Sequence, residues 1–285
     1  MSKWEKTLGV AAGAAAYLYA QNTWIQKTEY HISINHLAVE NEGLKIAHLS
    51  DLHMPQTQID IKKLISMLQK EKPDLIFLTG DQVDGADPFN LVEAIAFFKQ
   101  LRKLAPTYAV NGNHDITSPN RKDLATLYRD SGVVYLQNEA YSVMLSGRKP
   151  LVIMGVAEQH RLLQTVSLNP LSKIPVREDW QGQTRLLLAH HPEHFEKYHL
   201  DANQSPDVTF SGHAHGGQIR IPKIGGLFAP GQGRMPKHTS GVFGLSQDPS
   251  KKLVVSRGLG PSQFPFRINN RPELVIVTLH QAERI

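Results

Sequence analysis

Aspartates, asparagines and histidines recur in five short clusters spread along the chain. In chain order they read DLH (51–53), GDQVD (80–84), GNHD (112–115), AHHPE (189–193) and GHAH (212–215). Any one of them has an ordinary explanation, because Asp and Asn beside Gly often cap turns and a single His is usually a hydrogen-bonded residue. Together they supply carboxylate, amide and imidazole ligands, which suit divalent transition-metal ions. The pattern predicts a metal centre, and paired metals clamp a phosphoryl group and make hydroxide from water near neutral pH.

The first three clusters follow predicted strands. Apolar runs predict strands at 44–51, 74–81 and 107–115, and helical spacing predicts helices at 59–72 and 88–104. This strand–helix alternation indicates parallel βαβ units. Ligands of such sheets collect beyond the carboxyl ends of the strands, which is where these clusters are expected to lie.

The second half of the chain is different in pattern. Short strands are predicted at 139–146, 150–158, 184–191, 206–216, 251–260 and 272–280, mostly without long helices between them. We expect them to form a second, more antiparallel sheet packed on the first. No internal repeat or linker divides the chain, so a single catalytic domain is predicted over 41–285, after an N-terminal segment and lead-in over 1–40.

The amino-acid composition limits the kinds of metal site and binding partner that the chain can have. The chain has 285 residues and no cysteine, which excludes disulfides and thiolate metal sites. A formal net charge of +5 and a pI near 9.3 favour an anionic partner, such as a membrane surface, a nucleic acid or a phosphorylated substrate, or else a generally solvated surface.

Residues 7–26 carry no charge and are rich in alanine, with Lys3 and Lys6 before them and aromatic residues towards both ends. This predicts an apolar N-terminal helix that anchors the protein in a membrane as a single transmembrane helix. A cleaved export signal, with Ala14 to Ala16 as the cleavage site, and a helix lying on the membrane or packed on the domain are the alternatives. The leading lysines place the catalytic domain on the extracytoplasmic side, with the cytoplasmic face as the alternative.

Over roughly 44–279, the five clusters resemble those of the calcineurin-like metallophosphoesterases. The resemblance implies an α/β fold, a four-layer sandwich of two mixed β-sheets flanked by helices. It also implies two divalent ions (Mn, Fe or Zn), with Asp81 bridging them. One ion would be bound by Asp51, His53, Asp81 and His215, and the other by Asp81, Asn113, His190 and His213.

The resemblance also implies a mechanism. A metal-bridging hydroxide would attack phosphorus while His114 protonates the leaving oxygen, and Asp84 would orient His114. We expect His191 to be structural, because neighbouring side chains of a strand point in opposite directions.

The substrate is less well defined by the sequence. GDQVDGA and GNHDIT lack the arginine and glutamate typical of the protein phosphatases of this superfamily. The segments LLLAHHPE, SGHAHGGQ and 255–279 resemble a bacterial membrane- or envelope-associated branch that includes pyrophosphatases acting on UDP-diacylglucosamine. A phosphodiester or pyrophosphate on a lipid-linked substrate is therefore expected, with Arg257 and Arg267 as candidates to hold a distal phosphate.

One departure from that branch is Glu158, which stands where relatives often have an aspartate-rich turn. The alternatives are a nucleic-acid or nucleotide phosphodiesterase, and less favoured are a phosphomonoesterase or a non-catalytic metal-binding scaffold. Nucleic acid is disfavoured because no patch interleaves basic and aromatic residues. The scaffold is disfavoured because metal binding alone does not need His114 or Asp84. No protein partner is evident.

Overall fold

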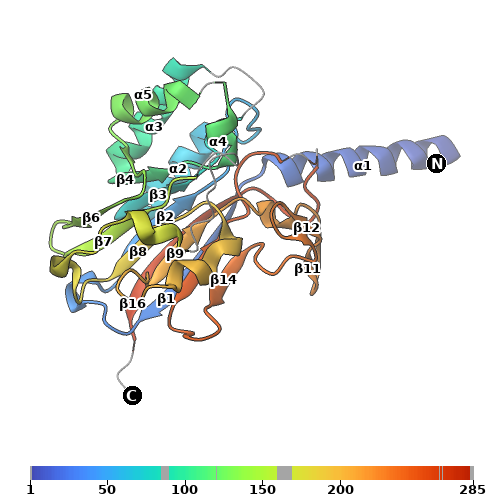
Figure 1. Ribbon diagram of the computed structural model, residues 1–285. Coiled ribbons are helices and arrows are strands. Elements are labelled where there is room, and N and C mark those ends of the chain that lie inside the picture. The colour runs from blue at the N-terminus through green and yellow to red at the C-terminus, as the bar shows by residue number, and fades with distance from the viewer. Residues whose placement is uncertain are drawn as a thin grey trace.

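Two six-stranded β-sheets packed face to face form the body of the protein (Figure 1). The computed structural model describes residues 2–84, 90–119, 121–158, 169–262, 264 and 266–282. The first sheet has the strand order β1 (Gln26–Ile34), β16 (Glu273–Gln281), β2 (Leu44–Leu49), β3 (Leu75–Thr79), β4 (Thr107–Val110) and β5 (Val134–Tyr135). The second has the order β14 (Gly241–Gly244), β15 (Lys252–Val255), β9 (Val208–Ser211), β8 (Arg185–Leu188), β7 (Leu151–Gly155) and β6 (Glu139–Val143).

Both sheets are mixed, as expected from the family resemblance. In the first sheet β2, β3, β4 and β5 are parallel, and β16 is antiparallel to β2 and parallel to β1. In the second sheet β15, β9, β8 and β7 are parallel, and the edge strands β14 and β6 are antiparallel to their neighbours. The carboxyl ends of β2, β3 and β4 therefore lie along one edge of the first sheet, and those of β8 and β9 along one edge of the second.

Helices α2 (Ile61–Glu71), α3 (Leu91–Leu104) and α5 (Arg121–Ser131) form the outer layer on the first sheet. Asp60 caps α2 by accepting hydrogen bonds from the backbone of Lys62 and Lys63, and Asn90 caps α3 in the same way. Their apolar faces meet the strands in one core cluster that includes Leu68, Phe98 and Tyr128. These contacts fix the first sheet against its helices.

The core between the sheets is made by side chains of both. Phe77 of β3 and Phe210 of β9 meet edge to face, with ring centroids 5.0 Å apart. Every residue of β3, β4, β7 and β9 is buried, because both faces of each sheet are covered. A continuous apolar layer thus holds the two sheets together face to face.

Short 3₁₀ helices cover the outer face of the second sheet. They are η3 (Pro170–Lys173), η4 (Glu178–Trp180) and η5 (Pro192–His199), and they bury Leu171, Trp180 and Tyr198 against strands β7 and β8. This completes the four layers, so the predicted α/β sandwich of two mixed sheets flanked by helices is confirmed.

Smaller elements lie at the strand ends. They are η1 (Val39–Asn41), α4 (Asn113–Thr117), η6 (His215–Gly217), and two short hairpins made by β10 (Arg220–Ile221) with β11 (Gly225–Gly226) and by β12 (Phe228–Ala229) with β13 (Gly233–Arg234). The hairpins lie on the side of the body from which the N-terminal helix projects (Figure 1).

Three expectations about elements need correction. The last strand, predicted at 272–280 in the second sheet, is β16 in the first sheet, where it lies between β1 and β2. The strand predicted at 107–115 ends at Val110, and residues 113–117 form α4. The second sheet is antiparallel only at its edges. Residues 88 and 89 of the predicted helix at 88–104 lie outside the described residues.

The N-terminal helix α1 (Lys3–Thr23) projects from the body with no buried residue (Figure 1). In the described part of the chain, no helix combines the length and the apolarity needed to cross a membrane. The predicted transmembrane helix is therefore not found, because the middle of α1 is mostly Ala and Gly rather than Leu and Ile. The boundary between an N-terminal segment and a catalytic domain at residue 40 stays a prediction. Strand β1 lies before this boundary and pairs with β16 of the first sheet.

Candidate metal centre

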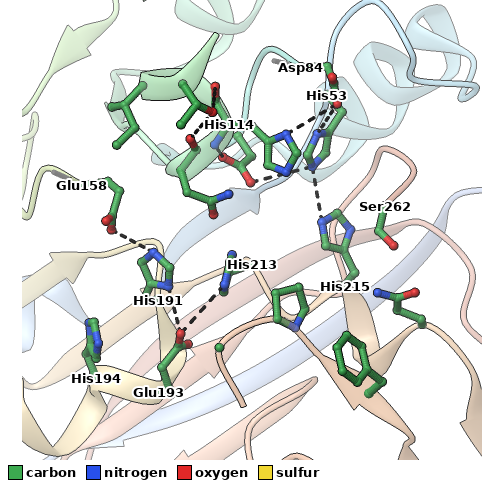
Figure 2. Close-up of a pocket in the computed structure, with 18 of the residues that line it drawn as sticks. His53, Asp84, His114, Glu158, His191, Glu193, His194, His213, His215 and Ser262 are labelled. Carbon is green, nitrogen blue, oxygen red and sulfur yellow. Dashed lines mark hydrogen bonds and ion pairs between the residues drawn. The ribbon is translucent and has the colours of Figure 1, made fainter. Parts of the chain in front are cut away.

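The polar clusters meet where the strand ends of the two sheets face each other (Figure 2). Asp51 and His53 follow β2, Asp81 follows β3, and Asn113 begins α4 just after β4. His190 follows β8, and His213 and His215 follow β9. The side chains of Asp51, His53, Asp81, His190, His213 and His215 are all at most 8% exposed.

Several of these residues adopt left-handed backbone conformations. The φ angles are 52° at Asp51, 50° at His53, 53° at Asp81, 64° at His213 and 45° at His215. Such a conformation costs roughly 1 kcal/mol or more in a residue other than glycine. Backbone hydrogen bonds between the loops hold it, such as His53 N to the Asp81 carbonyl at 3.0 Å. The loops thus hold unfavourable backbone conformations that turn these side chains towards one another.

One group joins the first sheet to the loop after β9. Asp51, His53 and His215 offer ligand atoms that lie within 4.8 Å of one another. The Nε2 atoms of His53 and His215 are 3.3 Å apart, and His215 Nε2 is 3.5 Å from Asp51 Oδ1. Backbone N–H of His213 donates to both carboxylate oxygens of Asp51, which ties this loop to the first sheet.

A second group lies beside it and is made by Asp81, His190 and His213. His190 Nε2 is 3.1 Å from Asp81 Oδ2, and its Nδ1 donates to the Thr79 carbonyl at 2.7 Å. Burial alone would raise the pKa of Asp81, but His190 and His53 outweigh it and hold that pKa well below its ordinary value. Asp81 is thereby kept ionised, as a metal ligand must be.

The donor set fits divalent cations. The Oδ1 atom of Asn113 is buried and has no hydrogen-bond partner among the described residues. Such an orphaned oxygen costs free energy unless another group satisfies it. With two carboxylates and four imidazoles around it, a bound cation is the fitting partner. The sequence-predicted ligands are thus brought together in one place, Asn113 included.

His114 lies at the open side of these groups. Its Nδ1 is 3.7 Å from Asp84 Oδ2, and its side chain is 28% exposed. Asp84 also receives a hydrogen bond from His53 Nδ1 at 3.2 Å. The backbone N–H of His114 donates to Asp81 Oδ1, which fixes α4 against the end of β3. Asp84 therefore contacts both His114 and a candidate metal ligand.

The expectation that His191 points away from the centre is wrong. Its imidazole lines the same cavity, 4.1 Å from the ring of His213 between centroids (Figure 2). Strand β8 ends at Leu188, so side-chain alternation no longer applies at His191. Glu158 lies 2.8 Å and Glu193 lies 3.0 Å from its two ring nitrogens. Although burial lowers the pKa of His191, these carboxylates raise it to about 9.

Neither candidate phosphate-binding arginine lines the cavity. Arg257 is buried and lies 3.0 Å from the Glu273 carboxylate. Arg267 is buried too, and donates to the carbonyls of Arg257, Asn270 and Gly260. The arrangement gives both guanidiniums structural partners in place of a phosphate.

Two residues that support the site are not assigned a role from the sequence. Asp115 accepts hydrogen bonds from the backbone of Gly112 and Val83, and burial raises its pKa to about 7. Asn270 is fully buried and donates from Nδ2 to the carbonyls of His215 and Gln218. Asp115 is the last residue of the GNHD cluster, whereas nothing in the local sequence links Asn270 to a loop 55 residues away.

A cavity of about 960 Å³ opens over the centre. Its lining includes the candidate ligands His53, Asp81, Asn113, His213 and His215, and one wall is made by Glu158, His191, Glu193 and His194 (Figure 2). Phe228, Pro230, Gly231 and Ser262 also line it. The described lining contains acidic, imidazole, amide and apolar groups but neither Lys nor Arg.

Comparisons with known proteins agree with this geometry. Residues 44–217 match the sequence profile of the family described as calcineurin-like phosphoesterase. The chain is 29% identical over 278 residues to YkuE of Bacillus subtilis (strain 168), named an uncharacterized metallophosphoesterase, covering 96% of this chain and 91% of that one. It is 27% identical to phosphodiesterase YaeI of Escherichia coli (strain K12), covering 96% and 95% of the two chains.

A third relative carries additional sequence. The chain is 26% identical to a transmembrane protein with metallophosphoesterase domain from Danio rerio, covering 89% of this chain and 57% of the relative. The matched family region contains all the candidate metal ligands. The chain belongs to the calcineurin-like phosphoesterase family and is a metal-dependent phosphoester hydrolase that uses two divalent ions.

Proposed function

We propose that the chain cleaves phosphodiester or pyrophosphate bonds at the strand ends that the two sheets share. Asp51, His53, Asp81 and His215 would hold one divalent ion, and Asp81, Asn113, His190 and His213 the other. The proposal is carried by the convergence of two histidine–aspartate groups beside the buried, unpartnered Asn113 Oδ1. Bound ions would neutralise charge on the phosphoryl oxygens and lower the pKa of water.

His114 is proposed as the general acid. Its imidazole is the one beside the ligands that reaches the cavity with more than a quarter of its side chain exposed. A proton on this ring can pass to the leaving oxygen of a substrate seated over the centre. Asp84, 3.7 Å away, would orient the ring.

The cavity lining supports a phosphodiester over a phosphomonoester. A monoester carries a second negative charge, and the described walls offer neither Lys nor Arg to balance it, whereas Glu158 and Glu193 add negative charge. A diester has one charge fewer and a second organic group. The apolar side chains of Ile116, Phe228 and Pro230 are available to contact that group. YaeI, the Escherichia coli relative, is named a phosphodiesterase.

Membrane association is part of the proposal. Helix α1 exposes Trp4, Leu8, Val10 and Tyr19, side chains that partition into the lipid interface. This favours a lipid-linked substrate over a nucleic acid. We propose manganese as the activating ion for assay, because imidazole and carboxylate ligands accept it.

The test is hydrolysis of bis-p-nitrophenyl phosphate by purified full-length protein with added Mn²⁺. We expect turnover that chelator abolishes and that exceeds turnover of p-nitrophenyl phosphate. Asp81→Asn should remove activity, and the exposed Asp130→Asn should serve as the matched control with activity unchanged. Faster cleavage of the monoester would overturn the diester assignment, and activity that survives both chelator and Asp81→Asn would overturn the site.

A further inference from the structure

Large apolar side chains are exposed on the segments 221–235 and 264–266, which include a residue of the cavity lining. They are Ile221, Ile224, Phe228, Met235, Phe264 and Phe266, with exposed fractions between 39% and 61%. We call these six residues the apolar rim. Phe228 also lines the cavity, so the rim begins at the entrance itself. An exposed apolar patch at a site entrance indicates an interaction surface.

The rim and helix α1 belong to one surface. Ile219 pairs with Ile268 in an isolated bridge, and Asn269 donates from Nδ2 to the Arg220 carbonyl. Tyr17 of α1 donates to Asn269 Oδ1 at 2.8 Å. The hairpins β10–β11 and β12–β13 therefore lie beside the base of α1, as Figure 1 shows. Twelve of the twenty exposed large apolar residues in the described chain lie between residues 4 and 24 or in the rim.

The segment that carries four of the six rim residues is basic, although its Lys237 lies 3.8 Å from Glu196. Residues 208–247 contain no Asp or Glu. They contain four basic residues, of which Lys223, Arg234 and Lys237 are exposed. Basic side chains beside exposed aliphatic and aromatic ones are typical of surfaces that bind anionic lipid, where the apolar groups enter the acyl boundary and the cations meet headgroups.

We propose that the apolar rim docks on an anionic lipid surface, with α1 beside it, so that a membrane-borne phosphodiester enters the cavity directly from the lipid. This inference rests on the proposed function for its substrate and extends it to the route by which that substrate arrives. A second copy of the chain is disfavoured as the occupant, because a twofold contact would bring the same basic residues together. A nucleic acid is disfavoured because half of the rim, Ile221, Ile224 and Met235, is aliphatic and offers bases no stacking face.

The direct test uses the absence of cysteine from the native chain. Full-length Ile224→Cys, labelled with an environment-sensitive dye, should show a blue shift and at least a threefold emission increase with phosphatidylcholine–phosphatidylglycerol vesicles. Labelled Val92→Cys, which is exposed on α3 away from the rim, is the matched control and should not respond. No change at Ile224→Cys, or an equal change with pure phosphatidylcholine, would overturn the proposal.

Vesicle sedimentation gives an independent measurement. The double variant Ile224→Ser, Met235→Ser should bind the anionic vesicles at least tenfold more weakly, whereas Val92→Ser, Leu200→Ser should stay within twofold of the native chain. Equal binding by both pairs would contradict a docking role for the rim. Loss of self-association in the rim variant without vesicle binding by the native chain would assign the surface to a second copy. Tighter binding of an oligonucleotide than of vesicles would assign it to nucleic acid.

Failure of this inference differs from failure of the proposed function. The rim variant keeps every candidate ligand and His114, so its turnover of soluble bis-p-nitrophenyl phosphate should equal that of the native chain. Vesicle binding without turnover would leave the rim in place and contradict the phosphodiesterase assignment. Turnover without vesicle binding would support the phosphodiesterase assignment and contradict the docking role of the rim.

Discussion

His114 differs from the histidines proposed as ligands in its access to solvent. Its side chain is 28% exposed, whereas those of His53, His190, His213 and His215 are at most 8% exposed. Its imidazole lies 3.7 Å from Asp84, and its backbone N–H donates to Asp81. These features suit the proposed roles, with His114 as the general acid and the four buried histidines as metal ligands.

Replacing His114 by Ala should lower kcat by about 10²–10³ without loss of bound metal, because general acid catalysis contributes this much. The effect should be larger for a diester with a poor leaving group than for the p-nitrophenyl diester, since a good leaving group needs no proton. The measurement is kcat for two diesters that differ in leaving-group pKa, together with metal content. An equal loss for both diesters would remove His114 from the role of acid.

At this scale the sequence was most informative about the ligands. The five clusters carry their own chemical signature, and their positions after apolar runs predict that they share a sheet edge. Side-chain direction was harder to predict. The direction of the His191 side chain is wrongly predicted because the amino-acid sequence does not show that β8 ends at Leu188. The sequence suggests Arg257 and Arg267 as phosphate ligands. It does not reveal that both are buried and bonded to Glu273 and to backbone carbonyls, because those contacts form only in the packed chain.

At the scale of elements, the loop after β9 depends on a distant segment. Asn270 donates to two carbonyls of that loop, and a Cβ on Gly216, whose φ is 65°, would strike the Asn270 side-chain oxygen. The backbone N–H of Asn270 donates in turn to Gln21 of α1. The loop that carries His215 is therefore supported by the segment on which α1 rests.

Asn270→Ala should weaken metal binding by about 10-fold or more, because residues that orient ligands contribute this much to affinity. Loss of the two Nδ2 hydrogen bonds leaves the His215 carbonyl bonded to the backbone N–H of Gln218 and the Gln218 carbonyl to that of Ile268, and loosens the loop. The measurement is equilibrium Mn²⁺ binding to chelator-treated protein. Asn203→Ala, an exposed substitution remote from the loop, is the control and should leave the affinity unchanged. If both variants bind Mn²⁺ like the native chain, the supporting role of Asn270 is wrong.

Elements with strong periodicity were predictable, and those set by tertiary contacts were not. Helix α2 and strands β2 and β3 follow directly from apolar spacing and from Pro73 after the helix. Strand β1 alternates apolar with polar and charged residues, and its place is decided by pairing with β16. The parallel centre of the second sheet escaped prediction because 3₁₀ helices and loops make crossovers that lack a helical pattern.

At the scale of the whole molecule, Asp207 joins the two halves at the end opposite the metal centre. It lies just before β9, and its carboxylate is 2.7 Å from Lys251 Nζ and 3.1 Å from His36 Nε2. It also accepts a hydrogen bond from the backbone of Arg185. Burial would raise the pKa of Asp207, but the bonds from His36 and Lys251 outweigh it and lower that pKa.

Asp207→Asn should lower the free energy of unfolding by about 2–3 kcal/mol at neutral pH, because it removes charge-assisted hydrogen bonds from a buried carboxylate. A folded-state pKa below the unfolded value means that this stability is fully present above about pH 4, the unfolded pKa, and is lost as pH falls through the folded pKa. The difference between native and variant should therefore shrink in acid. Urea unfolding across this range measures it.

The exposed Asp130→Asn is the control for charge alone and should change the free energy of unfolding by less than about 0.5 kcal/mol. A difference between Asp207→Asn and the native chain that grows as the pH falls would contradict the assigned direction of the pKa shift.

The most direct test of the whole account is the stoichiometry of metal binding. Chelator-treated native protein, titrated with Mn²⁺ at equilibrium, should bind two ions per chain, and Asp81→Asn should lose or severely weaken both binding steps, since we propose Asp81 as a ligand of both ions. Binding of a single ion by the native chain, or of two ions with unchanged affinity by Asp81→Asn, would contradict it.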